Sequence, residues 1–269
     1  MAKLTLTIYD IVTQEGTATN PEMKSDISLS IGDGDVEGTI SKEIPIKTLY
    51  PILTPLGKVL GRKVRIDFKL SLVDFSFQQK MYTPDELTAK IYVNYSSDSS
   101  GKEQMLKFYM DDLAQLFANK KVSLTCSNIV DGKEESYIVG QDFYVHEVIP
   151  CKYPNKIYVT LRIYSPDKML TLTQYSRCWT AKKLSANILK SELTNYKLPY
   201  DTDKCVQCDT TQMKHLLKDS KEHIFPYLVQ YNESFYDMLC RTTNRWGEFM
   251  YYYDGKIHIG YDDDKGKAK

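Results

Sequence analysis

One cysteine pair in the sequence has a spacing that is typical of metal or redox chemistry. Cys205 and Cys208 form a Cys-x-x-Cys motif, as in zinc knuckles and dithiol redox pairs. A structural zinc needs four ligands, yet the sequence has no second Cys-x-x-Cys, and only His215 and His223 lie nearby. A redox pair is expected at a helix N-terminus directly after a strand, and the flanking residues show no such pattern. We therefore interpret the segment as a loop or as buried thiols and predict no metal site.

The other candidate groups do not form a catalytic pattern either. His146 and His258 complete the four histidines, and His258 alternates with isoleucines as a residue on the far face of a strand does. Residues 262–264 are three aspartates without the spaced ligands and glycine of a calcium loop, which indicates a solvated turn. Asp111 and Asp112 precede apolar residues and indicate a helix start. The sequence has no Gly-x-Ser-x-Gly, phosphate loop or His-Glu-x-x-His. We name no catalytic or cofactor-binding residue, and predict no cofactor and no enzyme activity.

Composition narrows the class of protein. The 269 residues carry 35 Lys plus Arg and 35 Asp plus Glu, and this zero net charge argues against a general nucleic-acid partner. No apolar run approaches the ~20 residues that span a bilayer. Residues 1–10 alternate like a strand and lack the apolar stretch of a signal peptide. We expect synthesis and folding in a reducing cytoplasm, where the six cysteines are buried thiols, with export by a route without a signal peptide left open.

The first 165 residues are predicted to be mainly strand. The clearest case is 64–72, where five apolar residues on one face alternate with four polar residues on the other. Glycine- and serine-rich turns separate the segments, and many short antiparallel strands at this spacing indicate a barrel or a sandwich. The other predicted strands are 4–9, 27–31, 89–95, 122–126, 137–139, 143–148 and 157–164.

From residue 180 the pattern changes. Residues 181–195 have Leu184, Ile188, Leu189 and Leu193 at helical spacing, so we predict a helix there. Residues 197–212 are polar and are interpreted as a loop. Residues 228–259 then form one ordered unit in which a strand leads into a capped helix, a glycine stop and a hairpin.

The helix of this unit has a start signal and a stop signal. Ser234 is a good N-cap, and Asp237 three residues later places a negative charge in the first turn. Gly247 supplies a left-handed stop. The hairpin follows, with an aromatic strand at 249–253, the tight-turn dipeptide Asp254-Gly255 and a return strand at 256–259. One helix face carries Phe235, Met238, Leu239, Thr242 and Trp246.

This unit resembles the VgrG family, the spike proteins of type VI secretion systems, and the related hub proteins of contractile phage baseplates. In that family a strand ending in Gln-Tyr leads into Glu-Ser-x-x-Asp-Phe-Leu-x-Arg, followed by Glu-Glu-Gly and an aromatic strand. Residues 161–167 and 177–184 look like the middle portion of the family. Met238 replaces the usual Phe, and Arg245-Trp246 replaces the acidic pair. The matching residues, which the resemblance implies are structural, are Gln230, Tyr231, Glu233, Ser234, Asp237, Leu239, Arg241, Gly247 and Tyr251.

The resemblance implies a fold and an assembly. The expected fold is mainly β with α+β additions, like a phage baseplate hub: a barrel-like antiparallel domain at 1–175 and a helix and hairpin portion at 176–269. Family members form homotrimers that dock on a tube of Hcp-type subunits, contact baseplate and effector or adaptor proteins, and leave the cell on contraction. They do not insert into membranes. Because such proteins continue past this point, the chain is expected to be an N-terminal fragment; a natural stop is the alternative.

Three other functions stay open. A phage or tailocin baseplate hub would share the same motif. A monomeric binding β-domain would present an exposed aromatic groove and would not self-associate. A Cys/His hydrolase would need a cysteine with a shifted pKa beside a histidine in a cleft.

Overall fold

The computed structural model describes residues 3–14, 22–32, 36–45, 63–95, 114–130, 133–153, 156–196, 206–209, 224–245, 250–253 and 255–260. The chain divides into two compact units. Unit 1 comprises Met1–Phe77 and Leu87–Ile163, and unit 2 comprises Gln78–Glu86 and Tyr164–Lys269. Several residues discussed above lie outside the described residues, namely Asp111, Asp112, Cys205, His215, His223, Trp246, Gly247 and Asp262 to Asp264.

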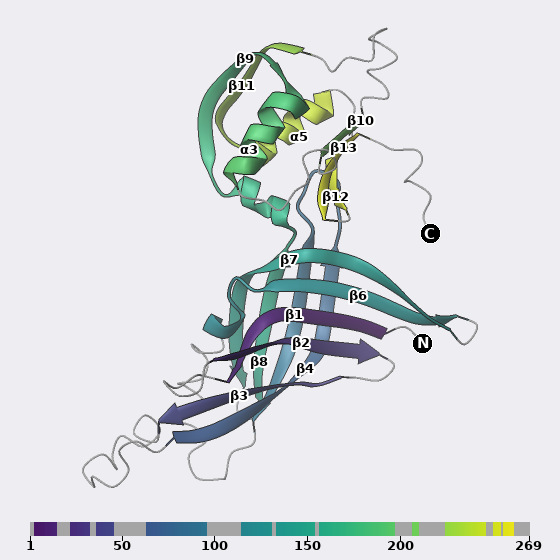
Figure 1. Cartoon of the computed structure of the whole chain (residues 1–269), viewed down its shortest axis with the longest axis vertical. Helices are drawn as coiled ribbons and strands as arrows, with labels where there is room; N and C mark the ends of the chain where they lie inside the picture. The colour runs from purple at the N-terminus through teal and green to yellow at the C-terminus, as the bar shows by residue number, and fades with distance from the viewer. Residues whose placement is uncertain are drawn as a thin grey trace. The chain divides into compact units, whose positions relative to one another are not determined.

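Unit 1 is built on one eight-stranded sheet (Figure 1). The order of the strands in the sheet is β2-β1-β6-β7-β8-β5-β4-β3, so that strands far apart in sequence become neighbours. The strands are β1 (Lys3–Gln14), β2 (Met23–Gly32), β3 (Gly38–Pro45), β4 (Lys63–Gln78), β5 (Glu86–Tyr95), β6 (Lys121–Val130), β7 (Lys133–Tyr153) and β8 (Lys156–Tyr164).

The sheet curls into a nearly closed antiparallel barrel. Its two end strands, β2 and β3, follow each other along the chain, and Ser30 of β2 forms an antiparallel bridge with Val36, two residues before β3 begins. The backbone N–H of Ser30 donates to the carbonyl of Val36 over 3.2 Å, and the N–H of Val36 donates to Ser30 Oγ over 2.8 Å. Gly38 then passes so close to β2 that a Cβ added there would lie 2.4 Å from Ile27 Cγ2. Glycine at this position therefore permits the two end strands to approach each other.

The core of unit 1 follows the two-residue period of its strands. On β5 the alternate residues Leu87, Ala89, Ile91 and Val93 are at most 1% exposed. The inward residues of β8 behave in the same way. Burial of each Leu, Ile or Val side chain contributes roughly 1.5–3 kcal/mol, so the alternation of apolar residues is the main force that selects the register of the barrel.

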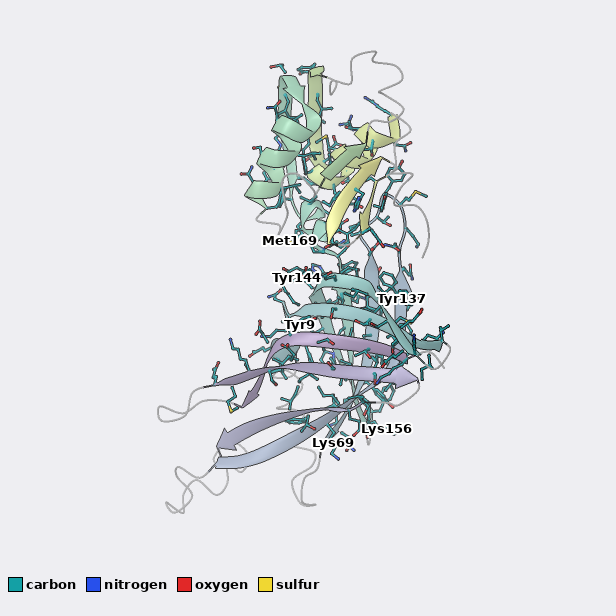
Figure 2. All side chains as sticks on the ribbon, turned by 45° about the vertical axis from the view of Figure 1, so that its right-hand side comes forward. Tyr9, Lys69, Tyr137, Tyr144, Lys156 and Met169 are labelled. Carbon is teal, nitrogen blue, oxygen red and sulfur yellow. The ribbon has the colours of Figure 1, made fainter. Side chains whose placement is uncertain are left out.

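The hairpin of β6 and β7 is different, because its outer part is exposed on both faces. Residues 133–139 of β7 are all exposed, and so are 128–130 of β6. Ile138 is 63% exposed, Ile129 56% and Tyr137 50%. Figure 2 labels Tyr137 on the side where the two strands end in their hairpin. This segment is thus a two-stranded extension of the barrel wall that carries apolar side chains in contact with solvent.

Unit 2 combines two small sheets with short helices (Figure 1). β9 and β11 pair antiparallel as a curved ribbon, and α3 and α5 lie against its inner face. The order β10-β13-β12 makes the second sheet, in which β10 is parallel to β13. The elements are the 3-10 helix η2 (Pro166–Thr171), β9 (Gln174–Lys183), the π-helical turn η3 (Leu184–Leu189), α3 (Lys190–Asn195), β10 (Val206–Asp209), β11 (Ile224–Ser234), α5 (Phe235–Arg245), β12 (Met250–Tyr253) and β13 (Lys256–Gly260).

The predicted fold class and all eight predicted strands of the first 165 residues are confirmed. The predicted segments 137–139 and 143–148 belong to a single strand, β7. Three strands, β3, β9 and β10, are not predicted. The predicted helix 181–195 is wrong at its start, because residues 181–183 end β9, and the predicted loop 197–212 contains β10. No helix among the described residues has the length and hydrophobicity to cross a membrane.

The compact units differ in two places from the domains 1–175 and 176–269 that the sequence indicates. The tip of the β4–β5 hairpin, Gln78–Glu86, belongs to unit 2, and unit 2 resumes at Tyr164. The chain therefore passes between the units three times. Because the sequence analysis places one boundary between two continuous domains, it does not separate the hairpin tip from the strands on either side of it. The assignment of domains stays a prediction.

The close approach at Gly38 gives a direct test of barrel closure. Gly38→Ala should destabilise the protein by about 1–3 kcal/mol, because the new methyl group overlaps the rigid branched side chain of Ile27. The neighbouring Thr39 is exposed, so Thr39→Ser should change the free energy of unfolding by no more than about 0.5 kcal/mol. Urea unfolding of both variants measures the difference. Equal stability of the two variants would contradict the packing of β3 on β2.

Candidate functional site

Arg177 of β9 is the centre of a polar network in unit 2. Its Nη1 and Nη2 donate to the two carboxylate oxygens of Glu192 on α3 over 2.8 and 2.7 Å. Its Nε donates to Gln230 Oε1 on β11 over 2.8 Å. The side chain of Glu192 is only 6% exposed and that of Arg177 is 29% exposed. This bidentate pair is therefore largely withdrawn from water, where charge-assisted hydrogen bonds are strong and costly to break.

Aromatic rings cover the rest of the Arg177 guanidinium. Its central carbon lies 4.9 Å from the ring centroid of Trp179, 5.1 Å from that of Tyr175 and 5.7 Å from that of Phe235. A planar guanidinium stacks on such rings while its edge donates hydrogen bonds, which a lysine ammonium does not do. The network thus joins β9, β11, α3 and α5 through one side chain.

A β-bulge brings Gln230 and Glu233 to the same face of the ribbon. Gln230 pairs with Arg177 and Glu233 pairs with Tyr175, so Tyr231 and Asn232 together oppose the single residue Ser176. Asn232 has a φ of 46°, a left-handed conformation that asparagine tolerates, and its N–H donates to Ser176 Oγ over 3.0 Å. In a regular strand, residues three apart point to opposite faces. The extra residue of the bulge turns Glu233 to the same face as Gln230. It leaves Tyr231 79% exposed on a backbone that the bulge fixes.

Two further contacts hold the bulge in place. Gln230 Nε2 donates to the carbonyl of Glu233 over 2.8 Å, and the Gln230 side chain is fully buried. Arg241 of α5 donates from Nη2 to Glu233 Oε1 over 2.5 Å and to the carbonyl of Val229 over 2.6 Å. Arg241 therefore ties the middle of α5 to both sides of the bulge.

The predicted start of the α5 helix is confirmed. The backbone N–H of Asp237 donates to Ser234 Oγ over 3.0 Å, and Ser234 Oγ donates to Asp237 Oδ2 over 2.6 Å. This exchange satisfies one of the N–H groups that the first helical turn leaves without a partner. The predicted apolar face is buried where the structure describes it, at Phe235, Met238, Leu239 and Thr242.

The predicted hairpin is also present. β12 and β13 pair antiparallel, and Gly255 has a φ of 74°, as the second central residue of a type I′ turn requires. His258 is 5% exposed, stacks on Tyr251 at 5.0 Å between ring centroids, and has its Nε2 3.1 Å from the carbonyl of Tyr253. Hydrogen bonds connect five of the nine predicted motif residues, in the pairs Gln230–Glu233, Glu233–Arg241 and Ser234–Asp237. Of the other four, Leu239 is buried on α5, Tyr231 faces solvent, Tyr251 lies on the hairpin and Gly247 lies outside the described residues.

Unit 2 contains a second polar cluster that the sequence gives no reason to expect. Asp85, Ser165 and Asp167 are 1–2% exposed, and Tyr236 of α5 is 3% exposed. Burial raises the pKa of Asp85 to about 7, with a further increase from the charge of Asp167. Burial raises the pKa of Asp167 to about 6, although Ser165 and backbone N–H groups donate to it. Paired carboxyls with raised pKa values are groups that general acid catalysis uses, but these are enclosed by protein.

The cysteines differ from the prediction of buried thiols. Among the described residues Cys151 and Cys178 are exposed, and Cys126 and Cys240 are partly exposed, so the prediction is wrong for the first two. Both lie on strand faces that nothing in the described residues covers. Burial, followed by the charges of Asp237 and Asp167, raises the pKa of the Cys240 thiol to about 12, which makes it a poor nucleophile. Within the described ranges, no group of three or more His, Cys, Asp or Glu side chains is placed to hold a metal ion.

No protein-family model matches the chain, and a search of curated proteins finds no match. Several solved structures align with the chain at low sequence identity. One is the E. coli protein c3393, described as a component of the type VI secretion system with structural similarity to the phage T4 tail proteins gp27 and gp5. It is 9% identical, with a TM-score of 0.45, over 74% of this chain and 48% of that chain.

Two further structures are the 43 kDa tail protein of prophage MuSo2 from Shewanella oneidensis and the Francisella PdpA–VgrG complex. The tail protein is 10% identical, with a TM-score of 0.44, over 72% of this chain and 53% of that chain. The half-lidded complex is 10% identical, with a TM-score of 0.45, over 98% of this chain and 32% of that chain. The chain thus spans from about a third to about half of the length of these proteins.

Sequence reasoning did not identify the partners of these networks. Arg177 lies in a segment that resembles the family, but nothing in the sequence pairs it with Glu192. One signal was available: Glu192 follows Ile188 by four residues and so falls on the apolar face of the predicted helix, where a carboxylate needs a partner. Asp85 lies in the polar run Thr83-Pro84-Asp85-Glu86 and has no comparable signal.

The buried Arg177–Glu192 pair can be tested against an exposed pair in the same chain. Arg177→Met should destabilise unit 2 by about 2–4 kcal/mol, because it leaves Glu192 buried without a cation. Arg162→Met, which breaks the exposed pair with Glu147, should cost no more than about 1 kcal/mol. The double change Arg177→Met/Glu192→Met should recover part of the loss in urea unfolding. Similar costs for Arg177→Met and Arg162→Met would contradict the role given to the buried pair.

Proposed function

We propose that this chain is a hub component of a type VI secretion spike, similar to VgrG. In this proposal three copies associate, dock on a tube of Hcp-type subunits, and transmit the force of contraction together with baseplate and effector or adaptor proteins. The protein is made in the cytoplasm without a signal peptide and is expelled on contraction. It acts through shape and contact area and catalyses no reaction.

The motif network is the observation that carries the proposal. The residues that resemble the VgrG pattern are those that hold the bulge, the cap and the helix of unit 2 together. Arg241 contacts Glu233, Gln230 contacts the backbone of Glu233, and Ser234 exchanges hydrogen bonds with Asp237. Their polar groups bind one another within the fold, as residues of a rigid building block do. A catalytic constellation would instead present such groups to a substrate.

Exposed aromatic side chains support a role in assembly. On the outer face of β11, Tyr231 is 79% exposed and Tyr227 is 63% exposed, and Tyr253 of β12 is 58% exposed. Tyrosine is enriched at protein interfaces because it offers a large apolar surface with a polar end. The zero net charge of the sequence favours a protein partner over nucleic acid.

A baseplate hub of a phage or tailocin is the second candidate, because the same motif occurs in those proteins. The two candidates differ in their tube partner and not in the chemistry of this chain. Docking on a sixfold tube by three copies requires each copy to present two equivalent surfaces, so either candidate requires self-association.

The oligomeric state of the full-length gene product tests the proposal. We expect light scattering to give the mass of three chains, and we expect the product to co-sediment with the Hcp-type tube protein of the same genome. A full-length product that stays monomeric at every concentration and does not bind the tube protein would contradict the proposal of a hub. The enzyme alternative predicts a turnover that is lost when Cys126, Cys151, Cys178 or Cys240 is replaced by serine.

A further inference from the structure

Two buried carboxyls in unit 2 lie where three segments meet that are distant in sequence. Asp85 ends the hairpin tip Gln79–Asp85, Asp167 lies in η2 and Tyr236 lies on α5. Asp85 is 2% exposed and Asp167 is 1% exposed. The tip also contacts other parts of unit 2, because the N–H of Tyr82 donates to the carbonyl of Met250 over 2.9 Å and Gln79 Nε2 lies 3.1 Å from the carbonyl of Tyr252.

Ser165 connects the two carboxyl residues. The N–H of Asp85 donates to Ser165 Oγ over 2.8 Å, and the N–H of Ser165 donates to the carbonyl of Asp85 over 3.1 Å. Ser165 Oγ donates in turn to Asp167 Oδ1. Gln79 Nε2 donates to Asp85 Oδ2 over 3.1 Å. These contacts fix the tip against η2 and place the two carboxyls in one enclosed cluster.

One polar atom of this cluster, Asp85 Oδ1, has no hydrogen-bond partner within the described residues. The hydroxyl of Tyr236 interacts with the Asp167 carboxyl, which helps to hold the phenol in its neutral form. Buried polar atoms almost always have partners, and an unpaired carboxylate oxygen is particularly costly in a low dielectric. A neutral carboxyl removes most of that cost.

The groups that face the carboxyls are neutral or acidic. The hairpin tip contributes Gln79 and η2 contributes Ser165. From α5, Tyr236 and Cys240 are both held in their neutral forms, because burial and nearby carboxylates raise their pKa values. For Cys240 those carboxylates are Asp237 and Asp167. The amino group of Lys168, also in η2, lies 4.9 Å from the ring of Tyr164. Across the described residues, neither Asp85 nor Asp167 forms an ion pair, so two negative charges there would have hydrogen-bond donors but no cation beside them.

We propose that Asp85 and Asp167 together retain a proton at neutral pH, and that this proton fastens the hairpin tip Gln79–Asp85 to η2 and α5. Asp85 Oδ1 is the oxygen that can carry it, since it accepts no hydrogen bond, and protonation there removes the charge that repels Asp167. When both carboxyls are ionised, their repulsion and their lost solvation favour release of the tip. The contact of the hairpin tip with η2 and α5 inside unit 2 is therefore sensitive to pH.

The sign of the pH dependence follows from the direction of the shifts. The pKa of Asp85 is about 7 and that of Asp167 about 6 in the folded chain, above the ordinary value of 3.8. The folded state therefore binds more protons than the unfolded state between about pH 4 and pH 7. The stabilisation is complete below this range and is lost as the pH rises through it.

Hydrogen exchange of the hairpin tip tests this sensitivity to pH. After correction for intrinsic exchange rates, the opening of segment 79–85 in the purified chain should increase at least about tenfold between about pH 5 and about pH 8. Asp85→Asn, which keeps the shape and removes the charge, should retain at the higher pH the protection that the unchanged chain has at the lower pH. Asp167→Asn should reduce the dependence in the same direction and serves as the second variant if Asp85→Asn does not fold.

Asp74→Asn is the matched control, because Asp74 is an exposed carboxylate on β4. It should leave the pH dependence of segment 79–85 unchanged. Protection of this segment that is equal at both pH values in the unchanged chain would overturn the proposal. So would a pH dependence that persists in both Asp85→Asn and Asp167→Asn.

Discussion

The partly buried guanidinium of Arg177 is the constraint on which the arrangement of unit 2 depends. A cation that is largely removed from water has to recover its solvation from the protein, and Arg177 does so with both carboxylate oxygens of Glu192, the amide oxygen of Gln230 and three aromatic rings. These partners come from α3, β11, α5 and β9 itself. Because a fork-shaped donor accepts few geometries, satisfying this one charge fixes how two strands and two helices lie against one another.

The residues that resemble a known motif act on the segment next to this cation. Gln230 accepts from Arg177 and donates to Glu233, and Glu233 accepts from Arg241. Ser234 then begins α5. In the sequence these polar residues resemble those of a catalytic site, but in the structure their side chains form hydrogen bonds within the fold. For this reason we assign the motif a structural role. The side chains that stay exposed nearby are chiefly tyrosines.

Patterns that depend on neighbours in sequence were predictable. The alternation of the barrel strands, the Ser234–Asp237 cap and the turn at Gly255 each follow from a few adjacent residues. Contacts between distant residues were not predictable. β10 pairs with β13 as a parallel neighbour, and the hairpin tip around Asp85 belongs to unit 2. Arg177 contacts Glu192 only because β9 curves over α3. Exposure of Cys151 and Cys178 was missed for the same reason, since apolar neighbours in sequence do not show what covers a strand.

The bulge at Tyr231 and Asn232 also determines which changes in chain length this segment tolerates during evolution. A relative that lacks one of these two residues has a regular strand, in which the counterparts of Gln230 and Glu233 are two apart and still face the helices. A relative that lacks both turns the glutamate to the opposite side and separates it from Arg241. Single deletions are therefore expected among homologues at this point, whereas double deletions should occur only where the arginine has changed as well.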